Sequence, residues 1–302
     1  MSFSPIISVV IPCYNHGHYL ADAIGSVKDC PESIYEIIVV NDGSTSVDTQ
    51  RILKELKAEG IQVIDQENAG VSKARNTGIA AAKGKYIFTL DADNKVYPNY
   101  LLRGKEILDT MPEVGVVYAD AHIFGEKGGT WVNHPLKYEE IAFENYIDNC
   151  AMFRKAVWEQ VGGYDENAPY ATREDYMFWL DAIRFGWEFY HLNEFAFAYR
   201  FQQNSKVRKF FKDPEKRLAV TDYLWKKQST LLKYLLETKK LSQVKADEIT
   251  GKLLLQLGSY YIRFGHKSIG LAYIIKAMKK PGFKIPGLRT IAASFWKRYL
   301  GK

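Results

Sequence analysis

The chain has 302 residues, of which 47% are hydrophobic and 25% are charged. These are ordinary values for globular proteins, so they exclude a largely disordered chain, and the length allows a large buried core. The net charge of +6 is unevenly distributed: residues 206–302 contain 23 Lys and Arg against 6 Asp and Glu, whereas residues 1–205 contain 18 against 29. This basic C-terminal region predicts an anionic partner, either membrane lipid or nucleic acid.

The cysteines and the apolar segments indicate the compartment. The three cysteines, Cys13, Cys30 and Cys150, are an odd number without the paired spacing of a metal site, which is typical of a reducing compartment. The N-terminal apolar run has no basic segment before it, so no signal peptide is expected, and no stretch reaches the roughly 18 apolar residues that span a bilayer. We therefore expect a cytoplasmic protein, either free or attached peripherally to the inner face of the membrane.

Apolar segments alternate with predicted helices over the first 90 residues. The first strand, IISVVI at 6–11, ends at Pro12 and has the continuous apolar pattern of a strand buried on both faces. Three more strands and three helices are predicted: strands 35–40, 61–64 and 86–90, and helices at about 20–27, 49–59 and 72–82. This alternation predicts βαβ units, a parallel sheet and right-handed crossovers. Ligands bind such sheets beyond the carboxyl ends of the strands, where Tyr14, Asp42 and Asp91 lie.

Two carboxylates, Asp91 and Asp93, directly follow the strand 86–90. Residues i and i+2 of an extended chain point the same way, so both carboxylates are expected to project beyond the end of the strand. They repel each other and stay ionised most easily beside a cation, and carboxylate oxygens are ligands that Mg²⁺ and Mn²⁺ prefer. The alternative is a polar turn that closes the strand.

Two common nucleotide-binding motifs do not occur in this sequence. The segment GIAAAKGKY at 78–86 is similar to a phosphate-binding P-loop, but it has one residue too many between its glycines, and Tyr86 replaces the Ser or Thr that binds Mg²⁺. No Gly-x-Gly-x-x-Gly follows the first strand. The sequence therefore argues against a P-loop NTPase and against a dehydrogenase with a dinucleotide-binding fingerprint.

Five segments in order carry a family resemblance: SVVIPCYNHGHYLADAIGSV, EIIVVNDGST, ENAGVSKARNTGIAAAKGKYIFTLDADN, NCAMFRKAVWEQVGGYDEN and TREDYMFWLDAIRFG. Together they resemble family 2 glycosyltransferases over about residues 6–205. The resemblance implies an α/β fold of the GT-A type, a Rossmann-like, mostly parallel sheet flanked by helices, with an α-helical C-terminal extension. It divides the chain into a GT-A domain at 1–205, with a nucleotide-sugar half at about 1–95 and an acceptor half at about 96–205, and a basic helical region at 206–302.

The resemblance also implies the donor-binding residues. Tyr14 would lie against the nucleotide base and Asp42 would accept the base N–H, although an Asp-Gly turn alone would also explain Asp42. Lys73 and Arg75 match basic positions that approach the base or phosphate, or they are solvated helix residues. The other positions expected to contact the donor belong to the same motifs: Pro12, Asn15, Gly43 and Ala92.

Asp91 and Asp93 match the Asp-x-Asp motif of this family. The match implies a divalent cation, Mn²⁺ or Mg²⁺, that stabilises the departing nucleoside diphosphate as negative charge builds up on it. Gln202 stands where relatives commonly carry a His that completes the metal site. The third ligand is therefore open among water, a substrate oxygen, Gln202 itself and the nearby His191.

Asp175, preceded by Glu174, matches the family's Glu-Asp pair. The resemblance implies that Asp175 takes the proton of the acceptor hydroxyl in a single inverting displacement, on the face of the sugar opposite the diphosphate. The alternative is structural, because Thr172 and Asp175 have the spacing of a capping box at the start of a helix. A position at a helix N-terminus is expected to keep the carboxylate ionised at neutral pH.

The pattern of the C-terminal region predicts helices, including a helical hairpin that ends near residue 281. In the last segment, 288–302, four apolar residues can share one helical face with basic residues around it: Ile291, Phe295, Trp296 and Leu300. This pattern suits an anionic membrane surface, although the helix could instead pack on its own domain. No nucleic-acid recognition motif accompanies the charge, so we expect no nucleic acid partner.

We therefore predict a metal-dependent, inverting glycosyltransferase. It would move a sugar from a nucleoside-diphosphate sugar, with UDP the expected nucleotide, to a hydroxyl of a glycan or lipid-linked glycan in cell-surface polysaccharide synthesis. Two alternatives come from other functional classes. One is a catalytically silent nucleotide-sugar-binding module that recruits a partner enzyme, and the other is a sugar nucleotidyltransferase, although the Gly-rich loop of that class is missing.

Overall fold

The computed structural model describes residues 5–30, 34–205, 210 and 212–281. Its N-terminal half is a parallel sheet in which all four predicted strands are confirmed: β1 (Ile7–Cys13), β2 (Tyr35–Asp42), β3 (Gln62–Gln66) and β4 (Tyr86–Thr89). β1 pairs in parallel with both β2 and β4, and β2 pairs in parallel with β3. The three predicted helices are also present, as α1 (Gly17–Lys28), α2 (Val47–Ala58) and α3 (Val71–Ala81).

The second half extends the same sheet with strands that the sequence pattern did not resolve. These are β5 (Lys95–Val96), β6 (Val114–Gly125), β7 (Gly129–Trp131), β8 (Met152–Arg154) and β9 (Glu188–Phe201). The order across the sheet is β3-β2-β1-β4-β8-β6-β9-β5, and β7 pairs with β6. β8 runs antiparallel to both of its neighbours, whereas β6 and β9 are parallel. The predicted α/β fold with a mostly parallel sheet is therefore confirmed.

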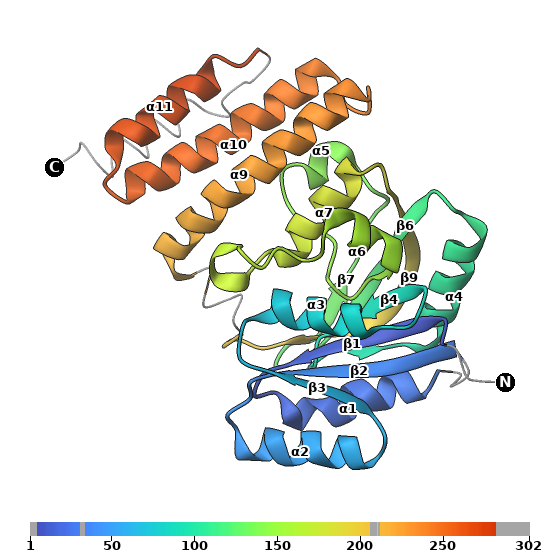
Figure 1. The fold of residues 1–302 in the computed structure, drawn as a ribbon. Coiled ribbons are helices and arrows are strands. Elements are labelled where there is room, and N and C mark those ends of the chain that lie inside the picture. Colours follow the sequence, from blue (N-terminus) through green and yellow to red (C-terminus); the bar gives the residue numbers. More distant parts are fainter. Residues whose placement is uncertain (1–4, 31–33, 206–209, 211, 282–302) are drawn as a thin grey trace.

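Helices cover both faces of the sheet (Figure 1). Val10 of β1 packs into a core with α3, whereas its neighbours Val9 and Ile11 pack into a second core with α1 on the opposite face. Such burial on both faces explains the continuous apolar pattern of β1. Gly78 lets α3 approach the sheet closely, because a Cβ there would lie 2.5 Å from Cγ1 of Val10. The remaining helices of this part are α4 (Pro98–Thr110), α5 (Tyr138–Ile141), α6 (Lys155–Val161), the short 3₁₀ helix η2 (Pro169–Ala171) and α7 (Glu174–Arg184).

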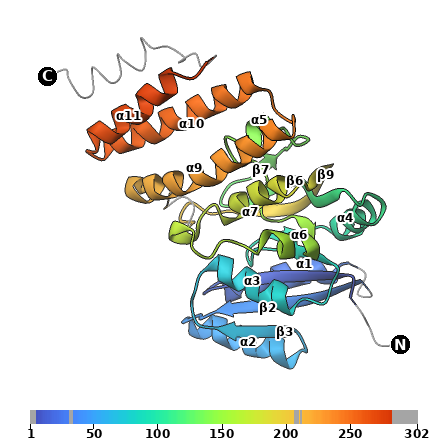
Figure 2. The ribbon, with the colours of Figure 1, turned by 45° about the horizontal axis from the view of Figure 1, so that its top comes forward.

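The C-terminal region is helical, as predicted, with α9 (Pro214–Glu237), α10 (Gln243–Arg263) and α11 (Lys267–Met278). The core that contains Trp179 of α7 continues into Leu231 of α9 and Leu253 of α10, so these helices share one core with α7. α10 and α11 form the expected hairpin and are the layer farthest from β1–β3 in both views (Figures 1 and 2). The division at residue 205 stays a prediction, and the segment 288–302 lies outside the described residues.

Within the described ranges, no helix is long and apolar enough to cross a membrane. The three cysteines are buried and free.

Candidate active site

The loops that follow β1 and β2 are joined by one asparagine. Asn15 adopts a left-handed backbone conformation, with φ at 58°. Its side-chain Oδ1 accepts hydrogen bonds from the backbone N–H groups of Thr45 and Ser46, each at 2.8 Å. Its neighbour Tyr14 remains 47% exposed. Asn15 therefore fixes the loops that present the Tyr14 ring at the carboxyl end of β1.

Asp42, at the end of β2, is only 4% exposed and receives three hydrogen bonds. Its Oδ1 accepts from the Gln66 side chain at 2.7 Å and from the Ala69 N–H at 2.9 Å, and its Oδ2 accepts from the Gly70 N–H at 3.0 Å. Gly43 follows with φ at +69°, a conformation that favours glycine. Asp42 thus fixes the entry to α3, and Oδ2 keeps a lone pair for a further donor such as a base N–H.

Three other positions predicted to contact the donor lie around the same sheet edge. Pro12 belongs to β1, and Ala92, between the two carboxylates, is buried. Lys73 has a half-exposed side chain whose Nζ lies 3.3 Å from a carboxylate oxygen of Glu166. Only Lys73 of these three presents a charged group to solvent.

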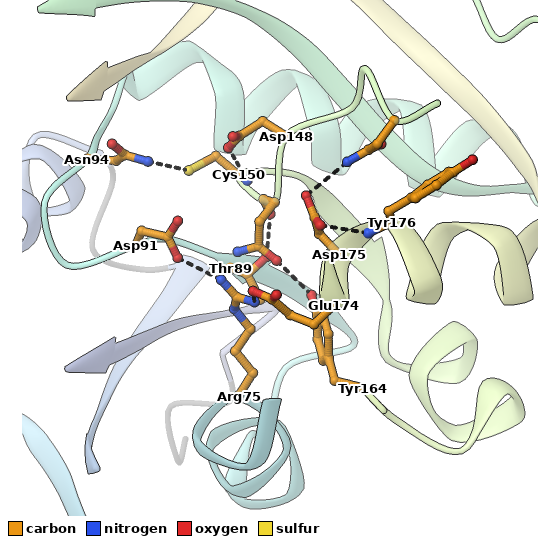
Figure 3. A network of polar contacts seen from close by, with 12 residues as sticks. Arg75, Thr89, Asp91, Asn94, Asp148, Cys150, Tyr164, Glu174, Asp175 and Tyr176 are labelled. Atoms are coloured by element: carbon orange, nitrogen blue, oxygen red, sulfur yellow. Dashed lines mark hydrogen bonds and ion pairs between the residues drawn. The ribbon is translucent and has the colours of Figure 1, made fainter. Parts of the chain in front are cut away.

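Arg75 lies at the centre of the polar network in Figure 3. Its side chain is 3% exposed, with one guanidinium nitrogen 2.8 Å from Asp91 Oδ1 and another 2.7 Å from Glu174 Oε1. The guanidinium also lies 5.3 Å from the centre of the Tyr164 ring. Burial opposes the charge, but Asp91 and Glu174 together raise the pKa of Arg75 above its ordinary value. The resemblance implied that Arg75 approaches the base or phosphate, with a solvated helix residue as the alternative. Arg75 is buried, which excludes the solvated alternative, and it links the Asp-x-Asp motif to the Glu-Asp pair.

Asp93 lies beside the residue that replaces the family's histidine. The Gln202 amide nitrogen donates to Asp93 Oδ2 at 3.3 Å and to the Tyr19 hydroxyl at 3.0 Å. Arg200 stacks on Tyr19 and donates to the Asp93 backbone carbonyl at 3.0 Å. Burial, together with the charge of Asp91, raises the pKa of Asp93 to about 6. The positive charge of Arg200 lowers the pKa of Asp93 only in part, so burial and Asp91 outweigh it.

The donor chemistry of these side chains suits a hard divalent cation. Two carboxylates and an amide that can present its oxygen form an oxygen set of the kind that Mg²⁺ and Mn²⁺ prefer. In the described part of the chain, no three His, Cys, Asp or Glu side chains come together as a metal-binding group. A site here would consequently need Gln202, substrate oxygens or water beside Asp91 and Asp93.

His191 was predicted as a possible third metal ligand, and the structure places it against Asp120 and Tyr118 instead. Its Nε2 lies 2.8 Å from Asp120 Oδ1, its side chain is 3% exposed, and its ring stacks on Tyr118. It does not form a metal-binding group with Asp91 and Asp93. His191 belongs to the β6–β9 pairing, where it lies opposite Tyr118.

Asp175 is partly buried in the first turn of α7 and has two hydrogen-bond donors. The Asn145 amide nitrogen donates to its Oδ2 at 3.0 Å, and the Tyr176 N–H donates to its Oδ1 at 2.7 Å. Burial raises the pKa of Asp175 to about 7, with the charges of Glu174 and Asp148 adding to the effect. The helix N-terminus was expected to keep this carboxylate ionised at neutral pH, but desolvation and neighbouring carboxylates outweigh it, so the carboxylate is only partly ionised there.

The capping-box alternative for Asp175 does not match the structure. The residue before α7 is Arg173, in a left-handed conformation with φ at 66°, and its side chain makes no capping hydrogen bond. The Thr172 hydroxyl is buried without a hydrogen-bond partner within the described residues. The first turn of α7 is thus held by contacts other than a capping box.

The sequence did not single out the polar residues that surround Asp175. Asp148 lies beside it in Figure 3 and accepts from the Cys150 N–H at 2.8 Å. Burial and the charge of Asp91 raise the pKa of Asp148 to about 6. Asn145 and Asp148 come from the segment before β8, which has no regular apolar period. The one feature of the sequence that could have identified them as site residues was their position next to the motif that begins at Asn149.

The arrangement supports acid–base chemistry next to the paired carboxylates Asp91 and Asp93. One carboxylate has a pKa near neutrality, where a general base works best. A buried arginine joins this carboxylate's neighbour, Glu174, to Asp91 at the end of β4. The two parts of the site are therefore held in a fixed relation.

Comparisons with known proteins agree with the fold and identify the family. The model of the family described as "Glycosyl transferase family 2" matches residues 8–163. An uncharacterized glycosyltransferase of Haemophilus influenzae is 28% identical over 251 residues, covering 74% of this chain and 76% of the relative. The putative teichuronic acid biosynthesis glycosyltransferase TuaG of Bacillus subtilis is 29% identical over 214 residues, covering 68% of this chain and 82% of the relative.

Solved structures share the fold. The crystal structure of S. aureus TarS 1–349 in complex with UDP-GlcNAc superposes with a TM-score of 0.66 at 16% identity, covering 96% of this chain and 91% of TarS 1–349. The mannosyltransferase PcManGT of Pyrobaculum calidifontis, in complex with GDP-Man and Mn²⁺, gives a TM-score of 0.57 at 15% identity, covering 93% and 89%. These likenesses extend through the C-terminal helices.

Proposed function

This chain belongs to glycosyl transferase family 2, and from that premise we propose that it transfers a sugar from a UDP-sugar to a hydroxyl of a glycan or lipid-linked glycan, with inversion at the anomeric carbon. The observation that carries the proposal is Asp175, a carboxylate with a pKa of about 7 beside the Glu174–Arg75–Asp91 chain. UDP as the nucleotide is supported by the TarS complex with UDP-GlcNAc.

Asp175 would act as the general base. The Asn145 amide and the Tyr176 N–H orient its carboxylate. The acceptor hydroxyl loses its proton to Asp175 as its oxygen bonds to the anomeric carbon, and the bond from that carbon to the diphosphate breaks on the opposite face. The proton ends on Asp175 and the electron pair leaves with UDP. With a pKa near 7 the residue is ionised in a substantial fraction of the molecules at neutral pH and is basic enough for this transfer.

Asp91, Asp93 and the amide oxygen of Gln202 would hold a Mn²⁺ or Mg²⁺ ion. Such an ion supplies neutralisation of the negative charge that builds up on the leaving diphosphate. Arg75 keeps one oxygen of Asp91 engaged, which leaves its other oxygen available. The Mn²⁺ in the complex of the structural neighbour PcManGT supports a cation of this kind.

The nucleotide would bind over β1 and β2. Tyr14 has an exposed ring for stacking, and Asp42 retains an acceptor lone pair toward the base. We assign the remaining contacts to the other donor positions of the family motifs: Pro12, Asn15, Gly43, Lys73 and Ala92. Cell-surface polysaccharide synthesis is the proposed process, supported by the similarity to TuaG.

The C-terminal region would contact an anionic membrane surface. On α11, Leu271, Ile275 and Met278 recur at helical spacing and are 48%, 51% and 53% exposed. The helix contains Lys267 and Lys276 and has no acidic residue. An apolar stripe beside basic residues on the outermost helix suits an interfacial position. Ile275→Glu should release the chain from anionic vesicles at low salt, and equal sedimentation of variant and wild type would remove this proposal.

Release of UDP from a panel of UDP-sugars, with Mn²⁺ or Mg²⁺ and without acceptor, tests the proposed function. Slow hydrolysis by the wild type that is lost in Asp175→Asn supports it, and Glu55→Gln, which changes an exposed carboxylate of α2, is the matched control. Binding of UDP-sugars without any UDP release from any of them would instead indicate a silent binding module. Release of pyrophosphate from UTP and a sugar phosphate would indicate a nucleotidyltransferase.

A further inference from the structure

The segment directly before β8 is held against the carboxyl end of β4. The Thr89 hydroxyl of β4 donates to the Asn149 carbonyl at 2.6 Å. The Asn94 amide, which directly follows the Asp-x-Asp motif, donates to Cys150 Sγ at 3.4 Å. Because these two contacts come from either side of that motif, the segment has a fixed position beside the paired carboxylates.

Asp148 is the first residue of this segment, and one of its two carboxylate oxygens is engaged by the backbone. Its Oδ1 accepts from the Cys150 N–H at 2.8 Å, which fixes the orientation of the side chain. No N–H or O–H group of the described residues donates to Oδ2, and this oxygen is not buried away from solvent. The thiol of Cys150, a weak donor, is the other hydrogen-bonding group beside this carboxylate. Asp148 therefore presents Oδ2 as an oriented acceptor.

The charge of Asp148 is partly compensated, so its remaining capacity is for a hydrogen bond. The positive charge of Arg75 lowers the pKa of Asp148, but the guanidinium nitrogens of Arg75 donate to Asp91 and Glu174. Within the described part of the chain, Oδ2 of Asp148 thus still lacks a strong donor. An ionised carboxylate accepts hydrogen bonds and cannot donate them, so a ligand must supply the hydrogen.

The Asp148 carboxylate lies between the two parts of the site (Figure 3). The charge of Asp91 raises the pKa of Asp148, and the charge of Asp148 raises the pKa of Asp175, as expected of carboxylates that lie close together. In the reaction proposed above, the diphosphate lies at Asp91 and the anomeric carbon faces Asp175. The transferred sugar would therefore lie along Asp148, with its hydroxyls as the nearest hydrogen-bond donors.

We propose that Asp148 selects the transferred sugar: its Oδ2 accepts a hydrogen bond from one hydroxyl of the donor sugar, and UDP-sugars without a hydroxyl at that position are rejected. The inference rests on the proposed function and adds a specificity-determining residue to it. A site built to bind a hydroxyl discriminates against an analogue that lacks it, because the polar group of the site is then left without its partner.

The test measures kcat/KM for release of UDP by the full chain with Mn²⁺ and without acceptor. The substrates are the UDP-sugar that the wild type cleaves fastest and its analogues in which fluorine replaces one hydroxyl at a time. Asp148→Ala should lower kcat/KM of the parent donor by roughly 10- to 100-fold, the effect of one hydrogen bond to a charged group, and that of one analogue by less than about threefold. The effect of fluorine on reactivity is the same in both proteins and cancels in this comparison.

Asp148→Asn is a second variant, because its amide oxygen can still accept from the Cys150 N–H and preserve the turn. It should show the same pattern with a loss of roughly five- to tenfold for the parent donor, since a neutral hydrogen bond replaces a charged one. Binding of UDP alone with Mn²⁺ should stay within about threefold of wild type in both variants, because UDP carries no sugar for Asp148 to bind. Asp109→Asn, on α4 beside Lys105, is the matched control and should leave every kcat/KM unchanged.

Two results would overturn the inference. One is no loss for the parent donor in either variant. The other is an equal loss for the parent donor and all of its analogues, which would mean that Asp148 acts only on the charge of its neighbours. If the wild type neither binds nor cleaves any UDP-sugar, the proposed function itself fails, and this outcome is distinct from the two others because it appears without any substitution.

Discussion

The substitution Asp175→Asn should abolish transfer and yet stabilise the protein above neutral pH. The pKa of Asp175 rises from 3.8 to about 7 in the folded protein, chiefly because of burial. The folded state therefore holds a proton that the unfolded state has released between pH 4 and pH 7. The free energy of unfolding of the wild type consequently falls as pH rises through this window, and the loss is complete above pH 7.

The size of this loss in the free energy of unfolding follows from the difference between the folded and unfolded pKa of Asp175. One pKa unit corresponds to about 1.4 kcal/mol, so the ionised Asp175 costs at most about 4 kcal/mol at pH 8. Its partial exposure to solvent reduces this value. Asparagine also has one acceptor oxygen in place of two, so one of the hydrogen bonds from Asn145 and Tyr176 is lost, at about 1 kcal/mol. The net expectation is a stabilisation of about 2 kcal/mol at pH 8.

Urea unfolding of wild type and Asp175→Asn at pH 5, 6, 7 and 8 measures this difference. The stabilisation should grow from pH 5 to pH 7 and then level off, while UDP release is lost at every pH. A difference that does not change with pH would refute the reasoning that Asp175 is a desolvated carboxylate with a pKa near 7.

Two further predictions concern the ion pairs of Arg75 with Asp91 and Glu174. Asp91→Asn should weaken UDP binding at least tenfold in the presence of Mn²⁺, which corresponds to about 1.4 kcal/mol. UDP binding without metal should be unchanged, and calorimetry measures both. Equal UDP affinities of wild type and Asp91→Asn in the presence of Mn²⁺ would contradict a cation role for Asp91. Arg75→Met should lower the free energy of unfolding by about 3 kcal/mol, because it leaves Asp91 and Glu174 without their buried counter-charge. Arg51→Met, in an exposed pair with Glu55, is its control, and equal losses in the two variants would argue against a special role of Arg75.

The first half of the fold follows closely from the sequence because β1, β2 and β4 are buried on both faces. β1 to β4 are short β-branched or aromatic runs between helices, and the order of such elements leaves few arrangements. β6 and β9 were harder to predict. β6 pairs with β7, β8 and β9 over different parts of its length, and its pairing with β9 contains register shifts, so neither strand has one apolar period throughout.

The position of a site residue could be predicted from the sequence where it depends on the residues next to it in the chain. The prediction failed where the position depends on partners far away in the chain. The position of Asp91 at the end of a strand was readable from local sequence. The ion pair of Arg75 with Glu174, 99 residues away, has no local pattern. The same holds for Asn145, which meets Asp175 because the segment before β8 folds over α7. His191 is near Gln202 in the sequence, but the structure pairs it with Asp120.

The most direct test of the central claim is anomalous diffraction from crystals grown with a UDP-sugar and Mn²⁺. The account predicts a manganese peak within coordination distance of carboxylate oxygens of Asp91 or Asp93, in contact with the diphosphate, with the anomeric carbon facing Asp175. A manganese peak elsewhere with the donor bound, or a donor whose anomeric carbon faces away from Asp175, would contradict it.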